Sequence, residues 1–137
     1  MKKILFTLLV FFTLASCTQN NGRIGDLFGL WKVESVEIDG VPDKDYPGTL
    51  FFAFQNDVVG MCETLENHES YWTYGQYFRD GGNIDMYFDM QGYAPLKISH
   101  FQTGLNACKI YELNGDKFVF STVIEDAEYR YRLKKWD

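Results

Sequence analysis

The chain has 137 residues, of which 46% are hydrophobic and 23% are charged, so it is too apolar for a disordered polymer and too short for two ordinary domains. Its 13 basic and 19 acidic residues give a net charge of −6, the wrong sign for a protein that binds a nucleic-acid backbone. Aromatic residues make up 18% of the chain and only 3 prolines occur, which favours pleated strands and excludes collagen-like architectures.

The first 16 residues have the character of a secretion signal. Two lysines precede an apolar run over residues 4–14, and residues 14–17 read Leu-Ala-Ser-Cys, which places small residues at a cleavage point. A helix over this run would rise about 16 Å, roughly half the thickness of the membrane hydrocarbon, so a spanning helix is not expected. We therefore expect residues 1–16 to be removed on export.

Residues 14–17 resemble the lipobox of bacterial lipoproteins. The resemblance implies that Cys17 is acylated and becomes the first mature residue, and each buried methylene of its lipid contributes about 0.8 kcal/mol to membrane binding. The residues that follow are polar, and we assign 17–26 to a lipidated tether. They begin with neither an Asp nor an acidic run, so the same resemblance implies the periplasmic face of an outer membrane. An ordinary signal peptide with a chance cysteine is the alternative.

From Gly29 onward the chain consists of short runs of alternating apolar and polar residues, separated by turn signals about every ten residues. The clearest run covers residues 84–90, where Ile, Met, Phe and Met alternate with polar residues on the other face. This spacing is typical of an antiparallel barrel or sandwich. The expected strands are 29–38, 49–55, 58–65, 71–79, 84–90, 107–113, 117–124 and 128–136, with 96–101 as an additional candidate.

Eight strands of this length close into a small antiparallel barrel, and closure removes exposed edges. The first strand changes phase between Val33 and Val36, which predicts a β-bulge at residues 34–35. Asp39-Gly40 and Asn114-Gly115 supply turn signals that fit hairpins. The predicted fold class is therefore all-β over residues 27–137, with a sandwich of the same strands as the alternative.

Gly29-Leu30-Trp31 forms a G-x-W motif at the start of the first strand, and the closing hairpin at residues 111–118 precedes an aromatic and basic last strand. Together these features resemble the lipocalin-like lipoproteins of bacterial envelopes. In lipocalins this tryptophan plugs the barrel floor and a basic residue of the last strand covers its ring. The resemblance implies that Trp31 has the first role and that Arg130 or Arg132 has the second, through a cation–π contact.

The side chains expected inside the barrel are unusually aromatic, and wide flat rings suit a pocket for an apolar or planar ligand. Side chains alone fill some barrels of this size, so a filled core is the alternative. The expected ligand-contacting residues are Phe52, Phe54, Trp72, Tyr74, Met86, Phe88, Phe118, Phe120, Tyr129 and Tyr131, with Phe78 also facing inward.

No sequence motif for hydrolysis, zinc chemistry or nucleotide binding occurs, so no catalytic residue, metal or cofactor is expected. The acidic residues at 63–69 lack the spacing of a calcium loop and predict a solvated loop. Cys62 and Cys108 can in principle pair in an oxidising envelope. They lie on the third and sixth strands of a meander, which places them too far apart for a disulfide.

The sequence thus predicts a non-catalytic, membrane-anchored envelope protein whose barrel binds a small apolar or amphipathic ligand. A protein-interaction module with a filled barrel, such as an inhibitor or accessory subunit, is the second hypothesis, because the aromatic stretch at residues 71–78 suits an interface. An enzyme is the third, since fold alone never excludes catalysis. The volume inside the barrel discriminates between the first two.

Overall fold

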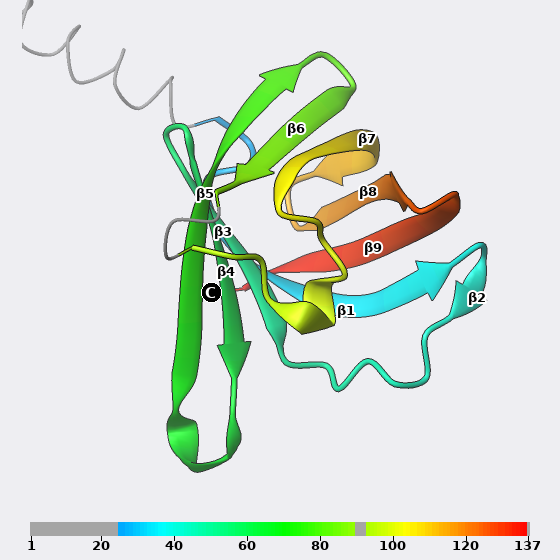
Figure 1. The fold of residues 1–137 in the computed structure, drawn as a ribbon. Coiled ribbons are helices and arrows are strands. Elements are labelled where there is room, and N and C mark those ends of the chain that lie inside the picture. Colours follow the sequence, from blue (N-terminus) through cyan, green and yellow to red (C-terminus); the bar gives the residue numbers. More distant parts are fainter. Residues whose placement is uncertain (1–24, 90–92, 137) are drawn as a thin grey trace, which may run out of the picture.

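Alternating apolar and polar residues form nine strands in the computed structural model, which describes residues 25–89 and 93–136 (Figure 1). The expected strand bounds agree with the structure to within three residues. The observed strands are β1 (Gly29–Ile38), β2 (Val41–Pro42), β3 (Leu50–Gln55), β4 (Val58–Thr64), β5 (Ser70–Asp80), β6 (Asn83–Phe88), β7 (Gly104–Asn114), β8 (Lys117–Ile124) and β9 (Ala127–Trp136).

The strands form one antiparallel sheet that closes on itself. Its order is β2-β1-β3-β4-β5-β6-β7-β8-β9, and β1 also pairs with β9 along most of its length. The eight long strands therefore make a closed barrel, and the two-residue β2 pairs only with the end of β1. This arrangement confirms the all-β barrel and excludes the sandwich. The signal segment, Cys17 and Met90 lie outside the described residues.

The predicted bulge in β1 is present and returns the strand to the correct phase. The pairing of β1 with β9 shifts register between Val33 and Ser35. Val33 and Val36 are consequently both buried, although their numbers differ in parity. The expected turn also forms: Asp39 and Gly40 both have positive φ, as in the mirror-image turns that suit the twist of a hairpin.

The prediction of an additional strand at 96–101 is wrong, because this segment forms a short 3-10 helix, η2 (Lys97–Ser99). The Ser99 hydroxyl donates to the Leu96 carbonyl at 2.6 Å and accepts from the Phe101 backbone N–H at 3.1 Å. His100 then adopts a left-handed conformation with φ of 63°. These local hydrogen bonds occupy backbone groups that a strand would offer to a neighbour.

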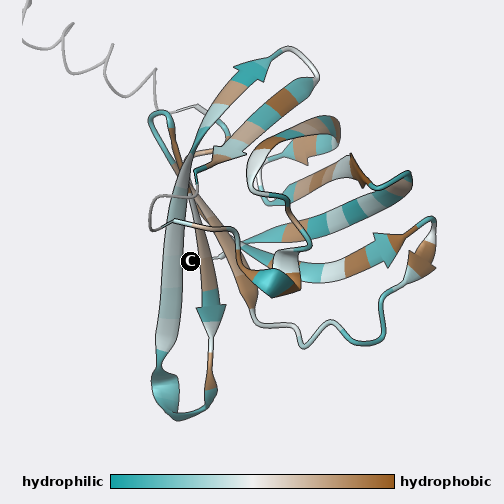
Figure 2. Cartoon of the chain, viewed as in Figure 1, coloured by the Kyte–Doolittle hydropathy of each residue, from teal (hydrophilic) through white to brown (hydrophobic). Residues whose placement is uncertain are grey.

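The core lies inside the barrel, and Figure 2 shows the corresponding alternation of hydrophobic and hydrophilic residues along β6. Trp31 closes the end of the barrel at which β1 begins, as the resemblance implied. Its indole N–H donates to the Leu27 carbonyl at 2.8 Å, and its ring contacts Phe118 edge-on at 5.6 Å. Because the core extends from Leu27 to Leu133, the segment 18–137 contains the whole barrel.

The expectation that Arg130 or Arg132 covers Trp31 is wrong. Lys135 does so instead, with its ammonium group 4.7 Å from the ring centroid. The even-numbered residues of β9 point outward, so Arg130 lies over the Tyr111 ring at 4.1 Å and Arg132 pairs with a carboxylate of β1. Lys135 has the inward parity and is the direct cross-strand partner of Trp31.

Cys62 and Cys108 are both free and buried. They lie on β4 and β7, which β5 and β6 separate in the sheet, so the geometric argument against a disulfide is confirmed. Burial raises the pKa of the Cys108 thiol to about 12 and also raises the pKa of Cys62. Both side chains are therefore protonated at neutral pH.

Replacement of Gly75 by Ala should destabilise the barrel by about 1–3 kcal/mol, the usual cost of overpacking. A Cβ on Gly75 would lie 2.3 Å from the Tyr87 carbonyl oxygen and 2.9 Å from the Phe88 ring. Gly82→Ala is the matched control, because its Cβ would meet nothing within 4 Å and should leave stability within about 1 kcal/mol of the wild type. Urea unfolding measures both, and equal stabilities would contradict the packing.

Candidate functional site

The interior of the barrel is filled by side chains. Seven of the ten residues expected to contact a ligand point inward and have essentially no accessible surface. A space large enough for a water molecule beside them would give them accessible surface, so these side chains pack against one another. Tyr129 also has inward parity, but it lies near the barrel end and is half-buried. The seven are Phe52, Phe54, Met86, Phe88, Phe118, Phe120 and Tyr131.

Phe101, which comes from a loop rather than a strand, packs into the aromatic core of the interior. The residue is 8% exposed and closes one end of the barrel. Four rings from four different strands surround it at centroid distances of 5.5–6.3 Å. Phe101 therefore fills the space in which a barrel of this size can hold a small ligand. The surrounding rings are Phe52, Phe88, Phe120 and Tyr131.

Hydrogen bonds to the barrel hold this loop in place. The buried Tyr131 hydroxyl donates to the Ser99 carbonyl, and burial raises the pKa of Tyr131 so that the donor stays protonated. The Asn106 side chain bonds both backbone groups of Gln102, each at 2.8 Å. His100 contributes a 3.3 Å contact to a carboxylate oxygen of Asp43. The loop is thus bonded to the barrel on both sides of Phe101.

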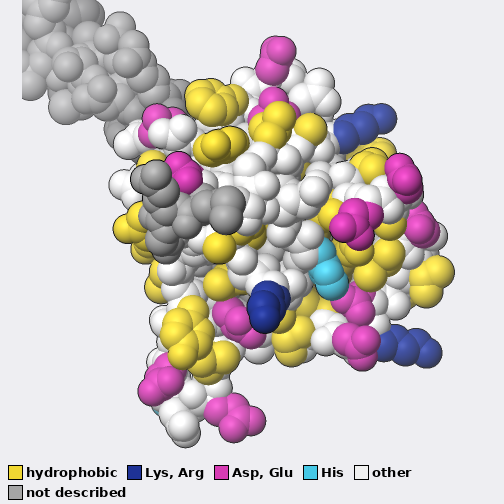
Figure 3. Space-filling model, viewed as in Figure 1, with side chains coloured by type: hydrophobic (Ala, Val, Ile, Leu, Met, Phe, Trp, Pro, Cys, Tyr) yellow, Lys and Arg dark blue, Asp and Glu magenta, His cyan; other side chains and the backbone are white. Residues whose placement is uncertain are grey.

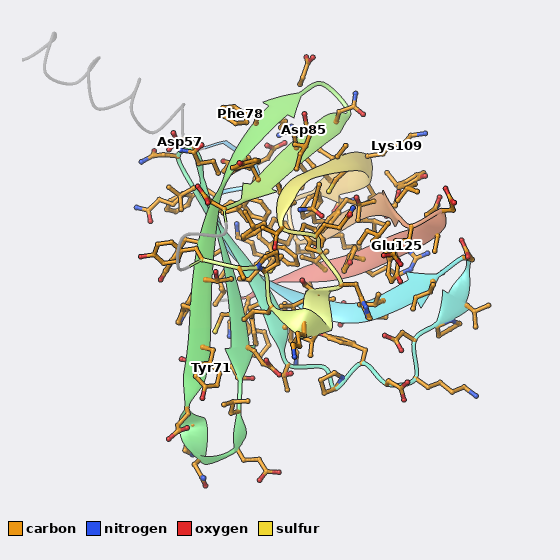
Figure 4. All side chains as sticks on the ribbon, viewed as in Figure 1. Asp57, Tyr71, Phe78, Asp85, Lys109 and Glu125 are labelled. Atoms are coloured by element: carbon orange, nitrogen blue, oxygen red, sulfur yellow. The ribbon has the colours of Figure 1, made fainter. Side chains whose placement is uncertain are left out.

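Three aromatic residues of β5 expected inside the barrel point outward instead. Trp72 is 43% exposed, Tyr74 44% and Phe78 62%, and Figure 4 shows Phe78 at the upper end of β5, with Tyr71 near its lower end. Aromatic residues occupy both parities of this strand, so period-two alternation does not identify its inner face. The inward positions hold the buried Thr73, Gly75, and Tyr77, whose ring meets Phe54 edge-on at 5.1 Å.

A groove of about 490 Å³ lies on the outer wall of the barrel, beside the outward-pointing Trp72 of β5. Its floor includes Phe51 and the buried Cys62, and Trp72 and Trp136 form two of its walls. The lining residues are Leu30, Phe51, Cys62, Thr64, Leu65, His68, Glu69, Ser70, Trp72 and Trp136.

Backbone register explains why these residues lie together. Phe51 of β3, Cys62 of β4 and Trp72 of β5 are direct cross-strand partners that point outward. Gly60 lies beside Trp72, and a Cβ there would be 3.3 Å from the indole, so the glycine leaves room for the ring to lie flat on the sheet. Trp136 contacts Phe51 edge-on at 5.6 Å. The groove is therefore apolar at its base and aromatic at its sides.

The two ends of the groove differ in charge. Beside the end formed by Trp136 lies the ammonium group of Lys32, which is not itself a lining residue; it is 5.2 Å from the Trp136 ring centroid, a cation–π contact. At the other end His68 and Glu69 come from the loop that joins β4 to β5, whose short helix η1 covers Glu66–His68. Within the described ranges, no group of three or more His, Cys, Asp or Glu side chains is arranged to hold a metal ion.

The fold resembles those of solved structures. A lipocalin-like protein from Bacteroides uniformis ATCC 8492 superposes with a TM-score of 0.65 over 82% of this chain and 100% of its own, at 18% identity. The fold of this chain is lipocalin-like. An uncharacterized protein from Bacteroides eggerthii DSM 20697 has a similar fold. It superposes with a TM-score of 0.59 at 18% identity, over 80% of this chain and 99% of its own.

No family model matches the chain, and no match was found among the curated proteins. The likeness to the two Bacteroides proteins therefore describes the lipocalin-like fold and leaves the site to be argued from this chain's own residues. Among residues 25–89 and 93–136, no helix is suited to crossing a membrane.

Sequence reasoning missed three residues that define the lipocalin-like barrel and its groove. Phe101 lies in a segment without clear alternation, and no sequence signal places it inside the barrel. Phe51 and Trp136 have outward parity on strands whose inner faces carry the stronger apolar pattern. Their aromatic character on a face expected to be polar is the signal that was available.

Replacement of Phe101 by Ala should cost about 3–5 kcal/mol of stability and open an apolar cavity. Dry cavities lined by such rings bind benzene, so benzene should raise the melting temperature of the variant but not that of the wild type. Phe78→Ala is the control, since this exposed side chain should change stability by no more than about 0.5 kcal/mol. An F101A variant that stays as stable as wild type would contradict the account of Phe101 as a plug.

Proposed function

We propose that this protein is an envelope lipoprotein, anchored through Cys17 to the periplasmic face of an outer membrane, whose barrel binds a small apolar or amphipathic ligand without catalysis. The sequence of residues 1–17 supports the anchor. The lipocalin-like fold and the aromatic groove on the outer wall support the binding role. Nucleic acid remains an unexpected partner because of the chain's net negative charge.

The observation that carries the binding role is the open groove between Trp72 and Trp136. The barrel interior is filled, so a ligand there would have to displace Phe101 and its four ring contacts. The outer groove needs no displacement, because its walls are already separated and both tryptophans are about half-exposed. Its volume of about 490 Å³ lies within the range of small-molecule sites.

The groove favours an elongated or planar apolar group. Its two indole walls provide flat surfaces, and each aromatic contact contributes about 0.5–1.5 kcal/mol beyond the area it buries. Phe51, Leu30 and Leu65 extend the apolar lining between them. Ser70 and Thr64 add hydroxyl groups at the edge, which can orient a polar end of the ligand.

A protein partner is the second candidate function, supported by a ladder of exposed rings beyond the groove. Trp72 stacks on Tyr74 at 5.9 Å with an interplanar angle of 9°, and Tyr93 meets Tyr74 edge-on at 6.1 Å. Figure 3 shows hydrophobic side chains exposed along the β4–β5 hairpin, with acidic side chains at its tip. A photo-crosslinker in place of Tyr74 should capture one specific envelope protein if this second function holds.

The anchor is tested by metabolic labelling with a radioactive fatty acid in cells. The wild-type chain should incorporate label, and Cys17→Ala should incorporate none, because the thiol that accepts diacylglycerol is missing. Cys62→Ala is the matched control, since the buried Cys62 is not expected to be acylated. A wild-type protein without label would overturn the anchor and leave an ordinary secretion signal.

The groove is tested with the neutral dye N-phenyl-1-naphthylamine and the soluble segment 18–137. The dye should bind with enhanced fluorescence, and the double variant W72A/W136A should weaken binding about tenfold or more, as expected for the loss of two aromatic contacts. Phe78→Ala removes a still more exposed ring of β5 outside the groove and should leave affinity unchanged. Dye binding that ignores both tryptophans would contradict this site.

A further inference from the structure

One row of cross-strand partners crosses six strands on the outer wall of the barrel. Each member is the direct register partner of the next, from β8 through β9, β1, β3 and β4 to β5. All six side chains have outward parity. In order, the row reads Lys117, Lys134, Lys32, Phe51, Cys62 and Trp72. Its first half is cationic, and its second half is the floor and one wall of the groove.

The cationic half is not explained by the stability of the barrel. Like charges directly opposite each other on neighbouring strands are destabilising, and here Lys134 faces both Lys117 and Lys32. Within the described part of the chain, none of these three lysines forms an ion pair with a carboxylate. A concentration of positive charge in a chain with a net charge of −6 therefore has no compensating partner within the described residues.

We propose that the lysine row binds the anionic head of an amphiphile whose apolar body lies in the groove between Trp72 and Trp136. This inference rests on the proposed function, since it names the chemistry of the ligand for the same groove. The occupant is a single molecule with one hydrophobic chain or planar body and a carboxylate, sulfate or phosphate group at one end. The lysines provide compact positive charges that pair with any of these anions.

The geometry joins the two halves without a gap. Lys32 is the direct neighbour of Phe51 on the groove floor, and its ammonium group already lies over the ring of Trp136. Strands are about 4.8 Å apart, so the apolar floor from Phe51 to Trp72 spans about 10 Å and the lysine row beside it a similar length. A head group at Lys32 therefore places its apolar body on the groove floor.

The opposite end of the groove fixes the direction of the ligand. Glu69 lines that end and carries a negative charge, which disfavours a second anionic group there. Only one orientation then brings the head to positive charge and the body onto the indole rings. A neutral amphiphile gains the apolar contacts alone, and a cationic one meets Lys32 at one end.

Three amphiphiles that share a ten-carbon chain test the inference on segment 18–137. They are decyl sulfate, decyl maltoside and decyltrimethylammonium, each below its micelle concentration, with affinity measured by isothermal titration calorimetry. Decyl sulfate should bind about tenfold more tightly than decyl maltoside. Raising the ionic strength from 0.05 to 0.5 M should remove most of that preference, because exposed charges are screened.

A matched pair of triple variants tests the contribution of the three lysines to head-group binding. K32Q/K117Q/K134Q should lower decyl sulfate affinity about tenfold and decyl maltoside affinity by much less, so the ratio of the two affinities falls. K44Q/K97Q/K109Q makes the same change in net charge at three exposed lysines outside the row and should alter neither affinity. Since the first variant removes like-charge repulsion, it should be no less stable than wild type. The single variant K134Q should show a smaller loss in the same direction.

The outcomes separate this inference from the proposed function. If all three amphiphiles bind equally and W72A/W136A abolishes binding, the groove stands and the lysine row is overturned as a head-group site. If decyltrimethylammonium binds most tightly, the Glu69 end selects the ligand and the inference is again overturned. If none of the amphiphiles binds, or if binding ignores both tryptophans, the proposed function itself fails.

Discussion

Pairing of β1 with β9 is the constraint on which the structure depends. It converts an open meander into a closed barrel, so every long strand has two neighbours and each side chain must point either into the barrel or out of it. The bulge between Val33 and Ser35 lets one strand satisfy both halves of this arrangement. Trp31 sits at the start of this pairing, opposite Lys135, which covers its ring.

Closure of the barrel also determines where open space for a ligand can lie. The inward positions supply so many large rings that the interior is filled, and Phe101 takes the remaining space from outside the sheet. Further aromatic residues have outward parity and lie on the outer wall, among them Trp72 and Tyr74 of β5 and Trp136 at the end of β9. A lipocalin-like barrel with a solid centre therefore presents its open apolar space on the outside, in the groove between Trp72 and Trp136.

The outer wall combines features that stability alone does not require. Exposed indole rings and a row of neighbouring lysines each carry a free-energy cost in water or from repulsion, and they lie in the same register row. Their shared position gives them a common physical explanation in one amphipathic, anionic ligand. The proposed anchor at Cys17 would keep such a site close to a lipid surface.

The sequence by itself determined the all-β class, the eight long strands, the bulge in β1 and the role of Trp31, because alternation and turn residues are local signals. It also predicts an export signal and an anchor at Cys17, which lie outside the described residues. Only the tertiary structure decided that β5 presents Trp72 and Tyr74 outward, that Lys135 rather than Arg130 covers Trp31, and that residues 96–101 form a plug. Barrel register and the competition of rings for one interior are long-range properties, and no local pattern contains them.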